Sequence, residues 1–70
     1  MSETVFRIRN KINGLFMHNR ISWSDRGVFI KSLEEAQNNA FWAGLDPNNF
    51  EIIEYVLNQE KIYEITKSVN

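Results

Sequence analysis

Residues 9–16 read RNKINGLF, and this stretch decides the fold because it reverses the chain between two segments of mixed apolar and polar residues. Asn13 and Gly14 both tolerate positive φ, so an Asn-Gly pair is a strong short-range signal for a β-hairpin. Before the turn, residues 4–9, TVFRIR, alternate with the period of two that is typical of a half-buried strand. We therefore predict a hairpin whose return strand covers about residues 15–22.

This hairpin can close in two registers, and both leave its side chains on the same faces. A two-residue turn places Ile12 opposite Leu15. A four-residue loop places Arg9 opposite Phe16. A three-residue turn would shift one strand by a residue and mix apolar with polar side chains, which argues against it. The predicted apolar face contains Phe6, Ile8, Leu15, Met17, Ile21 and Trp23, and the opposite face contains Val5, Arg7, Arg9, Lys11, Phe16, His18 and Arg20.

The middle of the chain predicts one helix. Ser32 and Glu35 form the S-x-x-E capping box of a helix N-terminus. An apolar stripe at helical spacing follows, consisting of Leu33, Ala36, Ala40 and Phe41. Gly44 stands where a left-handed residue commonly ends a helix, so we predict a helix over about residues 33–43. Trp42 lies off the stripe and either flanks the core or is exposed.

Two further segments are candidate strands. Residues 24–27, SDRG, form a turn cluster, and the short apolar run 28–30 after it is a possible third strand. Residues 50–57, FEIIEYVL, suit a central strand because Ile, Tyr and Val favour sheets. A helix that begins at Asp46-Pro47 is the alternative for this segment.

The end of the chain and the composition complete the fold prediction. We expect a turn at 58–60 and a last strand at 61–66. The prediction is a single α+β domain over residues 1–70, with a small, mostly antiparallel sheet in the order ββ(β)αββ and one helix packed on one face. With no Cys and one His, we expect no disulfide, metal or cofactor. A chain this short buries only about 60% of its unfolded surface, so a homo-oligomer is a possible source of extra stability.

Charge is distributed unevenly along the chain. The net charge of −1 argues against a general nucleic-acid binder. However, residues 1–31 contain six Lys/Arg and two acidic residues, whereas residues 32–70 contain two Lys and seven acidic residues. This separation either creates a basic surface or lets the two halves attract each other within the fold. The sequence leaves open which half binds a partner.

Residue types common in catalytic sites are present, but their arrangement argues against an enzyme. One grouping contains His18, Ser22, Ser24 and Asp25. These residues lie within eight positions on one predicted strand and turn, where they cannot easily converge as nucleophile, base and orienter. The Glu34-Glu35 pair is explained by the positive end of the predicted helix. The three Gly are isolated, so the chain has no phosphate-binding loop.

The polar face of the hairpin is the candidate binding surface. The candidate partner-binding residues are Arg7, Arg9, Lys11, Phe16, His18, Arg20 and Trp42. Such a set suits phosphates, with Phe16 as a stacking platform for a base. It also suits an acidic patch on a protein, because arginine and aromatic residues are common interface anchors. A third interpretation needs no ligand, since the outer face of a half-covered sheet requires charged residues for solubility.

The same residues carry a resemblance. The turn segment 9–16, a Trp, a Gly before a short apolar run, a capped helix and the segment 50–57 together resemble small accessory proteins of tailed bacteriophages. The matching positions are Asn10, Lys11, Gly14, Leu15, Phe16, Trp23, Gly27, Ile53 and Glu54. The likeness covers about residues 6–57, and the chain departs from it at 17–22 and in the tail 58–70.

The resemblance implies an origin and a kind of action. Small accessory phage proteins often bind and inhibit a host protein, including defence machinery. We therefore expect a non-enzymatic protein that acts in the host cytoplasm by covering a functional surface of a host protein. No apolar run approaches the roughly 20 residues of a membrane span, so no membrane association is expected. The alternatives are a nucleic-acid-binding module that uses the basic hairpin, and a structural virion or assembly protein.

Overall fold

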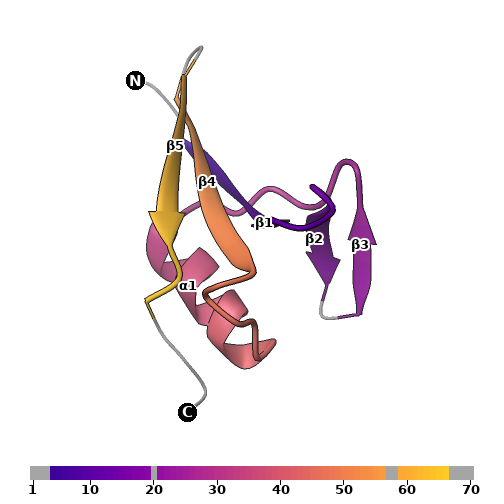
Figure 1. The fold of residues 1–70 in the computed structure, drawn as a ribbon. Helices are drawn as coiled ribbons and strands as arrows, with labels where there is room; N and C mark the ends of the chain where they lie inside the picture. The colour runs from indigo at the N-terminus through magenta and orange to yellow at the C-terminus, as the bar shows by residue number, and fades with distance from the viewer. Residues whose placement is uncertain (1–3, 20, 57–58, 67–70) are drawn as a thin grey trace.

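The computed structural model describes residues 4–19, 21–56 and 59–66, which form a five-stranded antiparallel sheet with one helix packed against it. The elements are β1 (Val5–Asn10), β2 (Phe16–Asn19), β3 (Ser22–Ser24), α1 (Leu33–Trp42), β4 (Phe50–Val56) and β5 (Gln59–Glu64). The strands lie in the order β3-β2-β1-β4-β5 (Figure 1). The predicted α+β class, with one helix on a small antiparallel sheet, is confirmed.

The predicted hairpin turn is present, and it is the four-residue loop of the two registers, because Arg9 lies opposite Phe16. Gly14 takes a φ of 76° and donates its N–H to the Asn10 carbonyl at 2.8 Å. The side-chain oxygen of Asn10 accepts the N–H of Ile12 at 2.8 Å. Local polar groups therefore hold the turn, which is why the sequence alone predicts it.

The return strand differs from the prediction, because the segment 15–22 does not form one continuous strand. β2 ends at Asn19, whose side-chain oxygen accepts the N–H of Ile21 at 3.0 Å, and β3 begins at Ser22. Trp23 lies opposite Met17 and packs against the core, as predicted. Ile21 was placed on the apolar face, and this is wrong: its side chain is 92% exposed just before β3.

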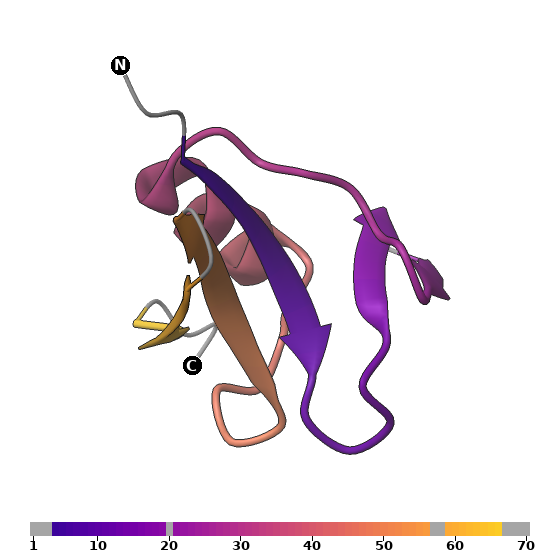
Figure 2. The same ribbon diagram turned by 90° about the horizontal axis from the view of Figure 1, so that it is seen from above.

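The segment 28–30 is not a strand; it is part of the linker between β3 and α1 and hydrogen-bonds to β2 and β1. The N–H of Val28 donates to the Met17 carbonyl of β2 at 3.0 Å. Ile30 exchanges two hydrogen bonds with Phe6 of β1, of 2.7 and 2.8 Å, in a single isolated bridge. Figure 2 shows this linker running from the β2–β3 hairpin across to α1. The linker therefore joins the outlying hairpin to the centre of the sheet.

The predicted N-cap at Ser32 and the left-handed glycine after the helix are confirmed, and α1 ends at Trp42, one residue before the predicted end. The Ser32 hydroxyl accepts the N–H of Glu35 at 3.1 Å, which satisfies one free donor of the first turn. Gly44 takes a φ of 69° just beyond the helix. The N–H of Leu45 then donates to the Ala40 carbonyl at 3.1 Å, the 6→1 bond of a Schellman motif.

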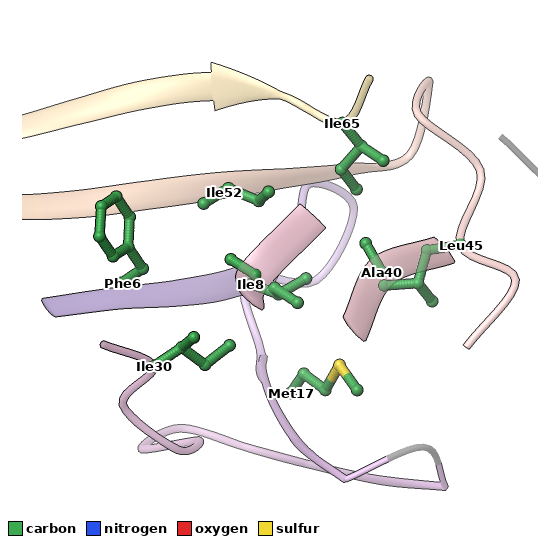
Figure 3. Close-up of a cluster of buried hydrophobic side chains, with 9 residues drawn as sticks. Phe6, Ile8, Met17, Ile30, Ala40, Leu45, Ile52 and Ile65 are labelled. Atoms are coloured by element: carbon green, nitrogen blue, oxygen red, sulfur yellow. The ribbon is translucent and has the colours of Figure 1, made fainter. Parts of the chain in front are cut away.

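The core lies between α1 and the sheet (Figure 3). Ala36 and Ala40 are fully buried on the helix, and their small side chains allow the helix axis to approach the strands. Ile8 and Ile52 lie opposite each other on β1 and β4, and both are fully buried. The other buried residues of this cluster are Phe6, Met17, Ile30, Leu45 and Ile65.

The strand alternative for the segment 50–57 is confirmed, because β4 pairs with β1 on one side and with β5 on the other. β5 begins at Gln59, directly opposite Val56. The predicted turn at 58–60 is therefore wrong at 59 and 60, where the β4–β5 ladder already continues, and position 58 lies outside the described residues.

Gly27→Ala should destabilise the fold more than Gly14→Ala. Both glycines have positive φ, which costs a residue with a Cβ about 1–2 kcal/mol. A Cβ at Gly27 would also overlap the Cβ of Phe16 and lie 3.0 Å from the Met17 carbonyl oxygen, whereas Gly14 faces open space. Overpacking adds about 1–3 kcal/mol to the loss at Gly27. Urea denaturation of both variants measures the difference, and equal losses would contradict the close packing of the linker on β2.

Tyr63 should ionise at a higher pH than an unperturbed tyrosine does. Its hydroxyl donates to the Glu54 carboxylate at 2.6 Å, and this bond, then desolvation and the nearby charge, raise the pKa of Tyr63 above 10.0. Because the raised pKa favours the protonated phenol, its contribution to stability is complete below pH 10 and is lost as the pH rises through the folded pKa. Absorbance titration of the wild type minus Tyr63→Phe isolates this group. Ionisation at or below the ordinary pKa would contradict the contact.

Candidate functional site

The candidate site is the outer face of the sheet, defined as the face turned away from α1. Residues of β1 and β4 that alternate with the buried Ile8 and Ile52 lie there. They are Val5, Arg7 and Arg9 on β1, and Glu51, Ile53 and Tyr55 on β4. Ile53 is fully buried although α1 does not cover it, so the side chains of the outer face pack against one another.

An arginine–aromatic cluster, consisting of Arg7, Phe16, Phe29 and Tyr55, lies on this face. The guanidinium carbon of Arg7 is 3.5 Å from the centre of the Phe16 ring. It is 4.8 Å from the Tyr55 ring and 5.2 Å from the Phe29 ring. Cation–π contacts of this kind contribute about 0.5–2 kcal/mol, more when water is excluded. The guanidinium is thus enclosed by rings from β2, the linker and β4.

Hydrogen bonds fix the orientation of Arg7 within the cluster. Its Nε and Nη2 donate to the Tyr55 hydroxyl at 3.0 and 2.7 Å. Its Nη1 donates to the Arg26 carbonyl at 2.7 Å. Because each guanidinium nitrogen already has a protein acceptor, Arg7 acts as a rigid part of the face. Phosphate binding by this face stays a prediction, which these contacts do not by themselves support.

Arg9 is also engaged within the fold. It forms an ion pair with Glu51, with the Nε–Oε2 distance at 2.8 Å, and the two residues lie directly opposite each other on β1 and β4. Opposite charges at such cross-strand positions stabilise a sheet. At this point the basic N-terminal half and the acidic C-terminal half attract each other, which is one of the two alternatives that the charge distribution left open.

The other predicted site residues that the structure describes, namely Lys11, His18 and Trp42, do not join the cluster. Lys11 is exposed in the hairpin loop, and His18 is exposed on β2. Trp42 is 67% exposed on α1, with its ring edge-on to Phe41 at 5.4 Å between centroids. Because α1 covers the other side of the sheet, Trp42 is not part of the outer face. Arg20 lies outside the described residues.

Sequence reasoning missed two members of the cluster. Tyr55 alternates with the core residues of β4, but its place beside Arg7 depends on the pairing of β1 with β4, which has no local signal. Phe29 was treated as part of a third strand, whereas it lies in the linker with its ring edge-on to Tyr55 at 6.4 Å. Phe29 is 60% exposed, so it extends the cluster into solvent.

Neither a metal site, a membrane-spanning helix nor a similar protein points to a function for the described part of the chain. Within residues 4–19, 21–56 and 59–66, no three His, Asp or Glu side chains gather in a way that could hold a metal ion. No helix in this described part of the chain has the length and apolar character needed to cross a membrane. No protein-family model, curated protein or solved structure matches the sequence. The surface of the chain itself is therefore the guide to its function.

Arg7→Lys should lower the free energy of unfolding by about 1–2 kcal/mol, because lysine cannot both stack on Phe16 and donate in a fork to Tyr55. Arg9→Lys is the matched control. It retains a cation opposite Glu51 in a partly exposed pair and should cost less than about 1 kcal/mol. Urea denaturation followed by circular dichroism measures both changes. A loss at Arg7 no larger than that at Arg9 would contradict the role of the cluster.

Proposed function

We propose that the chain is a non-enzymatic binding protein that covers a functional surface of a partner protein with the outer face of its sheet. The observation that carries this proposal is the arginine–aromatic cluster, which holds the exposed ring of Phe29 beside a fixed guanidinium. This cluster lies on the sheet face that α1 leaves uncovered.

The composition of the cluster supports protein binding. Tyrosine and arginine are among the residue types that dominate binding energy in protein interfaces. Arg7 and Tyr55 are already held by hydrogen bonds, so little side-chain freedom remains to be lost when a partner binds. Val28 is also exposed beside Phe29 in the chain, which adds to the apolar surface.

The resemblance to phage accessory proteins makes a host protein, such as a component of defence machinery, the expected partner in the host cytoplasm. Occlusion is the corresponding mechanism: the bound chain blocks access to the surface that it covers, and no bond is made or broken. The nucleic-acid alternative is less well supported, because Arg7 and Arg9 are engaged by Tyr55 and Glu51. Of the two, Arg9 has its charge balanced by a carboxylate, whereas Arg7 keeps its charge but directs its donors to groups within the fold.

Phe29→Asp should weaken binding to the partner about tenfold or more, since truncation of an interface anchor costs at least about 1–2 kcal/mol. The partner is first captured from a lysate of the host strain with the wild-type chain, then purified and titrated calorimetrically. Trp42→Ser is the matched control, because Trp42 is a similarly exposed aromatic residue outside the outer face.

Both variants change exposed side chains, so circular dichroism should show the wild-type fold for each. Equal affinities of wild type and Phe29→Asp would remove the outer face from the interface. A complex with nucleic acid that weakens steeply between about 50 and 200 mM salt would favour the nucleic-acid alternative instead.

A further inference from the structure

β5 is an edge strand whose outer backbone groups are only partly satisfied within the described chain. Gln37 of α1 shows which groups face this edge: its Nε2 donates to the Glu64 carbonyl at 2.9 Å, and its Oε1 accepts the N–H of Thr66 at 2.8 Å. Backbone groups of alternate residues point to the same side of a strand. The N–H and C=O groups of Ile62 and Glu60 therefore face the same edge as those of Glu64.

The side-chain amide of Gln37 makes the two hydrogen bonds that the backbone of one residue in an added strand would make. A single residue of a parallel neighbour bonds the carbonyl of one residue and the N–H of the residue two positions later, and the buried amide of Gln37 makes this pair of bonds. The edge is thus closed at 64–66. It stays open at Glu60 and Ile62, for which no neighbouring strand other than β4 is present in the described residues.

A groove beside this edge carries negative charge. It runs between α1 and β5, and its walls include Leu33, Glu34, Gln37, Ile62, Tyr63 and Glu64. Glu60 and Glu64 are exposed on β5, and Glu34 is exposed on α1. Lys61, the cation within β5, lies opposite Glu54 in the β4–β5 register. The open edge therefore combines backbone donors and acceptors with an exposed Ile62 between two carboxylates.

A second copy of this chain is a poor occupant of the edge. Antiparallel pairing of two β5 strands about Ile62 would place Glu60 of each copy opposite Glu64 of the other. Pairing about Lys61 would place two lysines opposite each other. Like charges directly opposite on neighbouring strands are destabilising. The charges favour a segment of different sequence and opposite sign.

We propose that the open edge of β5 binds an extended segment of a partner protein by strand addition at Glu60 and Ile62. This segment carries Lys or Arg opposite Glu60, an apolar residue opposite Ile62, and beyond it a Lys or Arg whose side chain reaches the exposed carboxylate of Glu64. Main-chain hydrogen bonds give the affinity in this mode, and the alternating side chains give the specificity. This inference goes beyond the proposed function, because it concerns a different surface and does not need Phe29.

Two synthetic peptides test the proposal. In the first peptide, every second residue is Thr, and the positions between the threonines are Lys, Val and Lys in turn. The second peptide has Glu in place of each Lys. Titration into ¹⁵N-labelled full-length protein should shift the amide signals of β5 with the Lys-Val peptide, which should bind more tightly than the Glu-Val peptide. Phe29→Asp should bind the peptide as the wild type does, so failure of the proposed function and failure of this inference are distinguishable.

Two variants separate strand addition from simple charge attraction. Glu60→Lys/Glu64→Lys changes two exposed residues and should weaken the Lys-Val peptide about tenfold and favour the Glu-Val peptide. Ile62→Pro removes a donor that faces the open edge and should abolish binding of both peptides.

Three outcomes of the peptide experiments would overturn the proposal. They are the absence of β5 shifts in the wild type at millimolar peptide, unchanged binding by a folded Ile62→Pro variant, and unchanged peptide preference in the charge-reversed variant. Self-association of the wild type through β5 would also overturn it, by assigning the edge to a second copy.

Discussion

The pairing of β1 with β4 is the interaction on which the rest of the structure depends. It joins residues 5–10 to residues 50–55, which are far apart in the sequence, and brings Ile8 opposite Ile52 at the centre of the core. The rest of the sheet extends outward from these two: β2 and the linker bond to β1, β3 bonds to β2, and β5 bonds to β4. α1 contacts both β1 and β4 and so covers this central pair.

A single short helix cannot cover a five-stranded sheet, and this limit shapes the outer face. α1 has ten residues and is therefore about 15 Å long. A sheet of five strands spaced about 4.8 Å apart is about 19 Å wide, measured across the strands. Only one face receives the helix. The outer face is stabilised by its own side chains, through buried Ile53, the enclosed guanidinium of Arg7 and the ion pair of Arg9.

Because one helix covers only one face of the sheet, the candidate surfaces lie on the other face and at the edge. The arginine–aromatic cluster stabilises the sheet and at the same time leaves Phe29 exposed, so one set of contacts supports both the fold and the proposed interface. The open edge of β5 adjoins the same face, since Ile62 lies opposite Ile53 in the register. A strand added to β5 would therefore widen the outer face.

The predictable parts of the fold are those that local chemistry determines. The turn at Asn13-Gly14, the Ser32 cap and the left-handed Gly44 each depend on neighbours within a few residues, and all three are confirmed. Alternation also assigned Arg7 and Arg9 to the same face. Sequence reasoning did not find the linker bonds at 28–30, because they depend on distant partners in β1 and β2. It also missed the separation of β2 from β3, although the bond between Asn19 and Ile21 that accompanies it is local.

By itself, then, the sequence determined the turn, the helix and the faces of the first strand, because backbone preferences and side-chain periodicity act over short separations. Only the tertiary structure decided what the arginines do. The register of β4 places Glu51 opposite Arg9, and the same pairing together with the linker brings Tyr55 and Phe29 against Arg7. In place of a freely exposed basic surface, this face has Arg9 paired with a carboxylate and Arg7, still charged, enclosed by aromatic rings. The surroundings of a cation depend on groups that the chain brings to it from far away.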